Sequence, residues 1–235
     1  MSWIGSRWVS SIGPGNPTGQ MMGVLDRLGN RWVSQTSDIL RPTMTRPRQP
    51  ASQQNRLRII GGRWRGLKIA FPDHAELRPS PDRVRETLFN WLQPVILDAR
   101  CLDLFAGSGA LGIEALSRGA ATVVLVERDA RTVKGIQTTL QRLDSTAATV
   151  VQADALEYLD KPPASPFNVV FLDPPYASGV LPEISDKLVR NGWLAPAASI
   201  YMEAPSDAPL PPMPATWTVH RSRQAGQVGY HLLRS

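Results

Sequence analysis

The feature that most constrains the fold is a regular alternation of short apolar runs with helical segments between residues 100 and 202. The apolar runs read as strands at 101–104, 122–126, 149–151, 167–172 and 199–202. The segments between them have helical periodicity at 109–118, 130–143, 155–159 and 181–190. Strands that alternate with helices form a mostly parallel sheet whose two faces are covered. We therefore expect an α/β fold of the Rossmann-like kind.

The first predicted strand leads into a glycine-rich loop with the sequence DLFAGSGALG at 103–112. It contains the G-x-G-x-x-G pattern, in which glycines let a ligand approach the backbone and the next helix offers free N–H groups. The same pattern serves dinucleotides, and a plain strand-to-helix turn also uses it. Asp103 favours S-adenosylmethionine, because a carboxylate before the glycines could hold its amino group but would repel a pyrophosphate.

Two further carboxylates follow the next predicted strands. Glu127 could accept hydrogen bonds from ribose hydroxyls, a role that NAD-binding proteins share. Asp154 could bind an adenine amino group, cap the short helix at 155–159, or do both. The predicted cofactor is S-adenosylmethionine, and its predicted binding residues are Asp103, Phe105, Ala106, Gly107, Ser108, Gly109, Glu127, Asp154 and Ala155.

The tetrapeptide Asp173-Pro174-Pro175-Tyr176 follows the apolar strand at 167–172. That strand should deliver Asp173 to the carboxyl edge of the sheet, beside the glycine loop. Prolines fix the backbone and remove N–H donors, so the Asp173 carboxylate and the Pro174 carbonyl could both accept hydrogens from the exocyclic amine of a base. Tyr176 could stack on a base that has left its helix. All four residues are predicted to be catalytic.

Cysteine, histidine and hydropathy exclude several classes of protein. The single cysteine, Cys101, excludes a disulfide framework, and we expect it to be a core residue rather than a nucleophile. The three histidines are far apart in sequence, so no local zinc motif exists and no metal is predicted. No apolar run reaches the roughly 18–20 residues that a membrane-spanning helix needs.

Charge is distributed unevenly along the chain. Residues 1–68 contain eleven basic and two acidic residues, whereas residues 69–235 contain fifteen basic and eighteen acidic ones. Such asymmetry indicates either a basic arm for a polyanion or a solvated basic tail. The segments 57–60 and 64–69 read as a hairpin around Gly61-Gly62, and a helix capped by Ser80 and Pro81 follows at 83–92. The predicted RNA-binding residues are Arg58, Arg63, Arg65, Lys68, Arg83 and Arg85.

Arg83 and Arg85 have a second interpretation, since they could instead pair with an acidic residue near the glycine loop. Residues 1–55 show no sustained period and are rich in Gly, Pro, Ser and Arg. They could be a disordered basic extension, an organelle-targeting segment, or the result of a true start at Met21, Met22 or Met44. The expected methyltransferase domain is 56–235, with the hairpin at 56–76, the catalytic core at 77–235 and a closing hairpin formed by 217–220 and 228–233.

Five stretches together resemble the bacterial RsmD family: RIIGGRWRG at 58–66, LRPSPDRVRETLFNWL at 77–92, DLFAGSGALG at 103–112, DPPY at 173–176 and AGQVGY at 225–230. The resemblance implies a class I methyltransferase that makes N2-methylguanine in 16S ribosomal RNA, at guanine 966 in the RNA's own numbering. It also implies a seven-stranded sheet with its last strand antiparallel, a small N-terminal hairpin that helps to hold RNA, and a monomer in the cytoplasm. Tyr176 stands where some members have Phe, and Ser80 where Thr is common.

Other functions remain open at this stage. The DPPY motif also suits adenine-N6 or cytosine-N4 methylation, although no sequence-reading domain is evident. An NAD-dependent oxidoreductase would use the same glycine pattern, but Asp103 and DPPY argue against it. A non-catalytic RNA-binding module is the third alternative. The sequence does not decide whether the substrate is naked RNA or a partly assembled small subunit.

Overall fold

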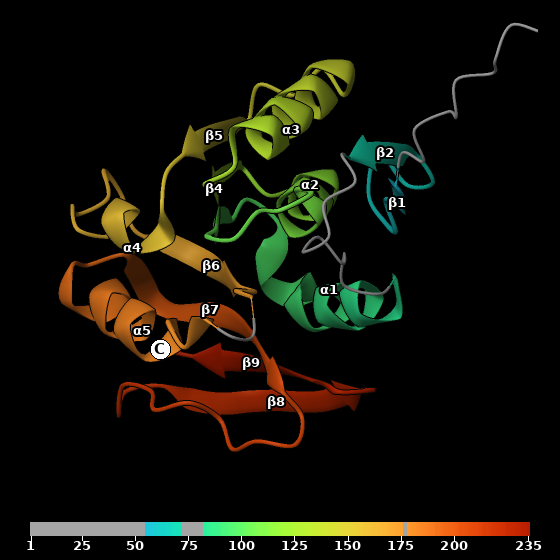
Figure 1. Ribbon diagram of the computed structural model, residues 1–235. Helices are drawn as coiled ribbons and strands as arrows, with labels where there is room; N and C mark the ends of the chain where they lie inside the picture. Colours follow the sequence, from blue (N-terminus) through green and yellow to red (C-terminus); the bar gives the residue numbers. More distant parts are fainter. Residues whose placement is uncertain (1–54, 72–81, 176–177) are drawn as a thin grey trace, which may run out of the picture. The chain divides into compact units, whose positions relative to one another are not determined.

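The structure is a computed structural model that describes residues 55–71, 82–175 and 178–235 (Figure 1). All of these residues belong to one unit of the chain, residues 49–235. The predictions for residues 1–54, for the helix cap at Ser80 and Pro81, and for Tyr176 lie outside the described residues.

A seven-stranded sheet forms the centre of this unit, with the order β5-β4-β3-β6-β7-β9-β8. Its strands are β3 (Arg100–Asp103), β4 (Thr122–Glu127), β5 (Ala148–Gln152), β6 (Phe167–Leu172), β7 (Leu194–Pro205), β8 (Thr218–Ala225) and β9 (Val228–Arg234). Strands β3 to β7 are parallel, whereas β9 runs antiparallel to both β7 and β8. The expected α/β class, with an antiparallel last strand, is confirmed. The order reverses between β3 and β6, and open α/β sheets bind ligands outside such a switch point.

Helices cover both faces of the sheet (Figure 1). They are α1 (Asp82–Ile96), α2 (Ala110–Ser117), α3 (Ala130–Arg142), α4 (Ala155–Tyr158) and α5 (Leu181–Arg190). Helices α1, α2 and α3 share one apolar core with one side of the sheet, and α4 and α5 share a second core with the other side. In α1, Val84, Leu88, Leu92 and Ile96 recur at four-residue spacing and are buried, which is why this segment is an amphipathic helix.

The N-terminal hairpin differs from the predicted one. Strand β1 (Asn55–Arg58) pairs with β2 (Lys68–Phe71), so the returning strand begins at Lys68 and not at residue 64. The intervening residues form a turn in which the Gly66 N–H donates to the Ile59 carbonyl at 2.9 Å and the Leu67 N–H donates to the Trp64 carbonyl at 3.1 Å. Trp64 therefore lies in the loop of the hairpin.

Other elements are also longer than the sequence predicts, including β8, which ends at Ala225 rather than at residue 220. Helix α1 continues through Pro94 to Ile96, and β7 begins five residues earlier than the predicted strand at 199–202. The early part of β7 pairs with β6 across a register shift between Phe167 and Val169. Apolar and polar residues do not alternate regularly there, so the sequence does not mark it as a strand. Within the described residues, no helix is both long and apolar enough to span a bilayer.

Candidate active site

Four acidic residues lie where four neighbouring strands end. Asp103 and Glu127 are the last residues of β3 and β4, Asp154 follows β5 by two residues, and Asp173 comes directly after β6. Because these strands are parallel and adjacent, the four residues share the carboxyl edge of the sheet. The structure thus brings together the predicted cofactor residues and the start of the DPPY motif.

The glycine loop turns sharply between β3 and α2. Gly107 and Gly109 have φ angles of 51° and 78°, in the left-handed region that favours glycine. The Ala106 N–H donates to the Val126 carbonyl at 2.9 Å, and the Gly109 N–H donates to the Ala106 carbonyl at 2.7 Å. These bonds hold the loop against β4. Phe105 is half-buried, whereas Ala106 and Ser108 are buried.

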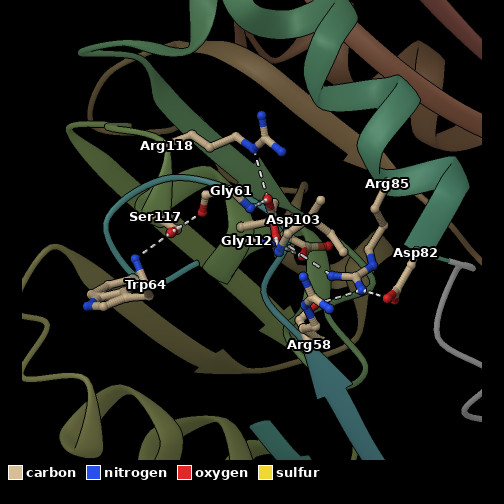
Figure 2. A network of polar contacts seen from close by, with 11 residues as sticks. Arg58, Gly61, Trp64, Asp82, Arg85, Asp103, Gly112, Ser117 and Arg118 are labelled. Atoms are coloured by element: carbon tan, nitrogen blue, oxygen red, sulfur yellow. Dashed lines mark hydrogen bonds and ion pairs between the residues drawn. The ribbon is translucent and has the colours of Figure 1, made fainter. Parts of the chain in front are cut away.

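The Asp103 carboxylate is enclosed within the loop, with its residue 1% exposed. Its Oδ2 accepts a hydrogen bond from the Gly112 N–H of α2 at 3.0 Å (Figure 2). Burial raises the pKa of Asp103 to about 7, as the bonds from the Gly112 and Phe105 N–H groups lower it less and the Glu127 charge raises it. In this structure Asp103 joins β3 to α2, and its contact with a cofactor amino group stays a prediction.

Glu127 and Asp154 are more accessible. The half-buried Glu127 carboxylate accepts hydrogen bonds from the Gly107 N–H at 2.8 Å and the Asp129 N–H at 2.9 Å. Asp154 is exposed and accepts the Leu156 N–H at 2.8 Å, which confirms its predicted helix-capping role at α4. Ala155, the first residue of α4, is buried. Glu127 therefore connects the edge of the sheet to the glycine loop.

The donors and acceptors at this edge fit S-adenosylmethionine. An ammonium, two ribose hydroxyls and an adenine amine are all donors, and the strand ends offer the acceptors Asp103, Glu127 and Asp154. A pyrophosphate in the glycine loop would instead meet the Asp103 carboxyl group. Among the described residues, no three His, Cys, Asp or Glu side chains are grouped so that they could hold a metal ion.

Cys101 is a core residue, as predicted. It is 0% exposed, and burial, with a smaller effect of the Asp103 charge, raises the pKa of its thiol to about 12. A thiol that stays protonated is a poor nucleophile.

The described part of the DPPY motif follows β6 at the switch point. Asp173 is half-buried, Pro174 is buried and Pro175 is exposed. The Ser178 N–H donates to the Pro175 carbonyl at 2.9 Å, so the chain turns directly after the motif. The motif and the glycine loop thus directly follow the adjacent strands β6 and β3.

The predicted RNA-binding residues divide into two groups. Arg58, Arg63, Arg65, Lys68 and Arg83 are exposed, and the Arg63 guanidinium lies 3.9 Å from the centre of the Trp64 ring. Arg85 is different, because it is 0% exposed. The prediction that Arg85 contacts RNA is wrong, since its guanidinium lies inside the protein and is bonded there to Asp82 and to the Arg58 carbonyl.

The second interpretation of Arg85, pairing with acidic residues, is confirmed. Its guanidinium donates to Asp82 Oδ1 at 2.6 Å and to the Arg58 carbonyl at 2.9 Å, and it lies 3.7 Å from Glu114 Oε2 (Figure 2). Arg85 therefore joins α1 to the hairpin and to α2.

Glu114 is a residue that the sequence interpretation missed. It is 1% exposed, and its two carboxylate oxygens accept the Ile60 and Gly61 N–H groups, each at 2.8 Å. The Arg118 Nε donates to the same carboxylate at 2.8 Å. A lone glutamate within the apolar run ALGIEALS was the available signal, because such a residue must find partners inside the protein.

Ser117 and Gly62 complete this connection between α2 and the hairpin loop. The Ser117 hydroxyl accepts the Trp64 N–H at 3.0 Å, and the Ser117 carbonyl accepts the Arg63 N–H at 2.8 Å (Figure 2). Gly62 has a φ of 75°, and a Cβ on it would lie 1.8 Å from the Ser117 carbonyl oxygen. The paired glycines thus allow the loop to lie directly against the end of α2.

Comparison with known proteins agrees with this geometry. The family described as "Conserved hypothetical protein 95" matches residues 57–234. The chain is 50% identical to "Ribosomal RNA small subunit methyltransferase D" of Escherichia coli K12, over 80% of this chain and 94% of that protein. The protein of the same name from Haemophilus influenzae is 42% identical, over 80% and 98% of the two chains.

Solved structures give the same result. The structure titled "Putative methyltransferase yhhF from Escherichia coli" has a TM-score of 0.72 and 49% identity, covering 77% of this chain and 98% of that chain. The structure titled "Crystal structure of SMU.776, a putative methyltransferase complexed with SAH" shares the fold alone, with a TM-score of 0.61 and 15% identity, covering 80% of this chain and 57% of that chain. The chain therefore belongs to the RsmD family, together with the ribosomal RNA small subunit methyltransferase D proteins.

Proposed function

We propose that this protein transfers a methyl group from S-adenosylmethionine to the N2 amine of a guanine in small-subunit (16S) ribosomal RNA. The target, by family resemblance, is guanine 966 in the numbering of that RNA. The observation that carries the proposal is the position of Asp173 and Pro174 directly after β6, next to the glycine loop after β3. The names of relatives that are up to 50% identical over nearly their whole length support ribosomal RNA as the substrate class.

The cofactor would be held at the ends of β3, β4 and β5. Glu127 would accept the ribose hydroxyls, Asp154 the adenine amine and Asp103 the amino group of the methionine part. The backbone of the glycine loop would lie against the cofactor. The bound cofactor supplies a methyl group on a sulfonium that carries its own leaving group. The protein therefore needs to supply position and electrostatic stabilisation rather than a metal.

Asp173 and Pro174 would activate the amine. The lone pair of an exocyclic base amine is delocalised into the ring, which makes the nitrogen a poor nucleophile. The Asp173 carboxylate and the Pro174 carbonyl would accept its two hydrogens and turn the nitrogen toward tetrahedral geometry. As the new N–C bond forms, one of these protons leaves through Asp173 to solvent. Tyr176 would hold the base by stacking.

The exposed basic residues of the hairpin and of α1 would contact RNA phosphates. Arg58, Arg63, Arg65, Lys68 and Arg83 are exposed, and phosphate contacts predict binding that weakens steeply with salt. We propose that the protein acts as a monomer in the cytoplasm, on RNA either free or within a partly assembled small subunit. Both substrates therefore belong in the assay.

Asp173→Ala tests the proposal. We expect transfer of labelled methyl groups to 16S RNA or to small subunits to fall by at least about 10³-fold. The affinity for S-adenosylmethionine, measured by calorimetry, should stay unchanged. Asp186→Ala is the control, because Asp186 is an exposed residue of α5. Methyl transfer by the Asp173→Ala variant at the normal rate would overturn the proposal.

Adenine-N6 or cytosine-N4 methylation is the second candidate, because the Asp-Pro-Pro-Tyr motif suits any exocyclic amine. Mass spectrometry of nucleosides from ribosomal RNA and from DNA of a deletion strain separates the two. Loss of N2-methylguanine from ribosomal RNA supports the proposal, and loss of N6-methyladenine or N4-methylcytosine overturns it.

A further inference from the structure

A second buried carboxylate lies beside the DPPY motif. Strand β7 is parallel to β6, and Leu172 is in register with Met202. The residue after Leu172 is Asp173, which directly follows β6, and the residue after Met202 is Glu203 on β7. Neighbouring strands are about 4.8 Å apart, so these two residues lie side by side at the carboxyl edge. Glu203 is 5% exposed, and the mechanism above does not use it.

The Glu203 side chain lies on the face of the sheet that α1 covers. The hydroxyl of Tyr201, two residues earlier on β7, donates to Glu203 Oε1 at 2.6 Å, so both side chains are on the same face. The Tyr201 ring meets the Phe171 ring edge-on, with 6.4 Å between their centres. Since Phe171 precedes Asp173 by two residues, extended backbone would place the Asp173 side chain on this face as well.

The Tyr201 hydrogen bond fixes the direction of the carboxylate. Tyr201 is 0% exposed and belongs to the apolar core, so its ring has little freedom. Glu203 is thus an oriented acceptor placed next to the residues that would hold the amine of the target base.

The chemistry of the bases then distinguishes among substrates. In guanine, the N2 amine is flanked by two ring nitrogens: N1, which carries a hydrogen and is a donor, and N3, which is an acceptor. In adenine and cytosine, the ring nitrogen next to the amine (N1 in adenine, N3 in cytosine) is an acceptor. A carboxylate beside Asp173 therefore attracts the N1–H side of guanine and repels the ring nitrogen next to the amine of adenine or cytosine.

We propose that Glu203 determines base specificity by accepting the N1–H of guanine, while Tyr201 positions its carboxylate. This inference rests on the proposed function, and it supplies a reason why a motif suited to any exocyclic amine would act on guanine.

The test uses 16S RNA assembled by ligation with either guanine or 2-aminopurine at the target position. 2-Aminopurine keeps the 2-amino group, but its N1 is an acceptor. We expect the unaltered protein to prefer guanine by about 100-fold in kcat/KM, because its buried acceptor would face another acceptor.

Glu203→Gln is the informative variant, since the amide can still accept the Tyr201 hydroxyl and can donate to N1 of 2-aminopurine. The preference for guanine should fall by at least tenfold, while the melting temperature and the cofactor affinity stay unchanged. Glu183→Gln makes the same chemical change at an exposed position of α5 and should keep the normal preference.

Several outcomes would overturn the inference. One is equal use of both bases by the unaltered protein, and another is a normal guanine preference in Glu203→Gln. If that variant does not fold, Tyr201→Phe takes its place, and a normal preference there would count in the same way. An unaltered protein that does not methylate guanine RNA at all contradicts the proposed function instead.

Discussion

The two ends of helix α2 use the same chemistry for different purposes. At its amino end, Asp103 and Glu127 accept N–H groups of the glycine loop and the helix. At its carboxyl end, Glu114 and Ser117 accept N–H groups of the hairpin loop. Exposure separates Glu127 from Glu114: Glu127 is half-buried at the edge of the sheet, whereas Glu114 is 1% exposed, as Asp103 is. Glu127 is therefore accessible to a ligand as it stands, whereas Glu114 joins α2 to the hairpin loop.

Replacing Glu114 should have the largest effect on stability. Glu114→Ala removes the acceptor of two buried N–H groups and leaves the buried Arg85 without its partner on α2. We expect a loss of about 3–5 kcal/mol in the free energy of unfolding, measured with urea. Ser117→Ala removes one side-chain acceptor and should cost about 1 kcal/mol. If Glu114→Ala lowered the free energy of unfolding by less than about 1 kcal/mol, the hydrogen bonds between α2 and the hairpin loop would not stabilise the fold as described.

Replacing Gly62 should separate RNA binding from cofactor binding. In Gly62→Ala the new methyl group would overlap the Ser117 carbonyl, so the loop must move away from α2. We expect a stability loss of about 2 kcal/mol and at least tenfold weaker RNA binding, with unchanged cofactor affinity.

Gly66→Ala is the matched control for this experiment. Gly66 also has a positive φ, of 86°, but no atom lies within 4 Å of its added Cβ. It should cost only the backbone strain, about 1 kcal/mol, and leave RNA binding normal. Equal effects of the two alanines on RNA binding would show that loop contact with α2 is irrelevant.

Glu127→Gln, at the amino end of α2, should weaken cofactor binding and leave stability nearly unchanged. The amide keeps one acceptor oxygen but lacks the charge, so the dissociation constant for S-adenosylmethionine should rise by about 10-fold or more. Stability should change by less than about 1 kcal/mol, because Glu127 is half-buried. Calorimetry and thermal melting measure the two quantities. A large stability loss with normal cofactor affinity would contradict this prediction, because it would show that Glu127 stabilises the fold and does not bind the cofactor.

The last expected effect is a pH dependence from Asp103. Its pKa is raised to about 7 from a usual value near 4, so the folded protein holds a proton that the unfolded chain has already released. The stability of the ligand-free protein should therefore fall as the pH rises from about 4 to 7. A cofactor ammonium favours the ionised carboxylate, so cofactor affinity should increase through pH 7. Asp103→Asn should flatten both curves, and unchanged curves would refute the assignment.

The arginines of α1 show where sequence reasoning succeeds and where it stops. Arg83 and Arg85 are two positions apart, which places them about 200° apart around a helix. Arg85 falls on the buried stripe with Phe89 and Leu92, a pattern that is visible in the sequence. Its partner Glu114 lies 29 positions later on another helix, and no local pattern connects them. The strand ends at Asp103, Glu127 and Asp173 were predictable, because each follows an apolar run.

The contacts of the hairpin loop have a consequence for how the chain is made. Its hydrogen bonds to Glu114 and Ser117 join residues 53 and 54 positions apart. Contacts of such separation cost loop-closure entropy and slow folding. During synthesis, β1 and β2 are translated before α2. The docking of the hairpin must therefore wait for the helix that carries its acceptors.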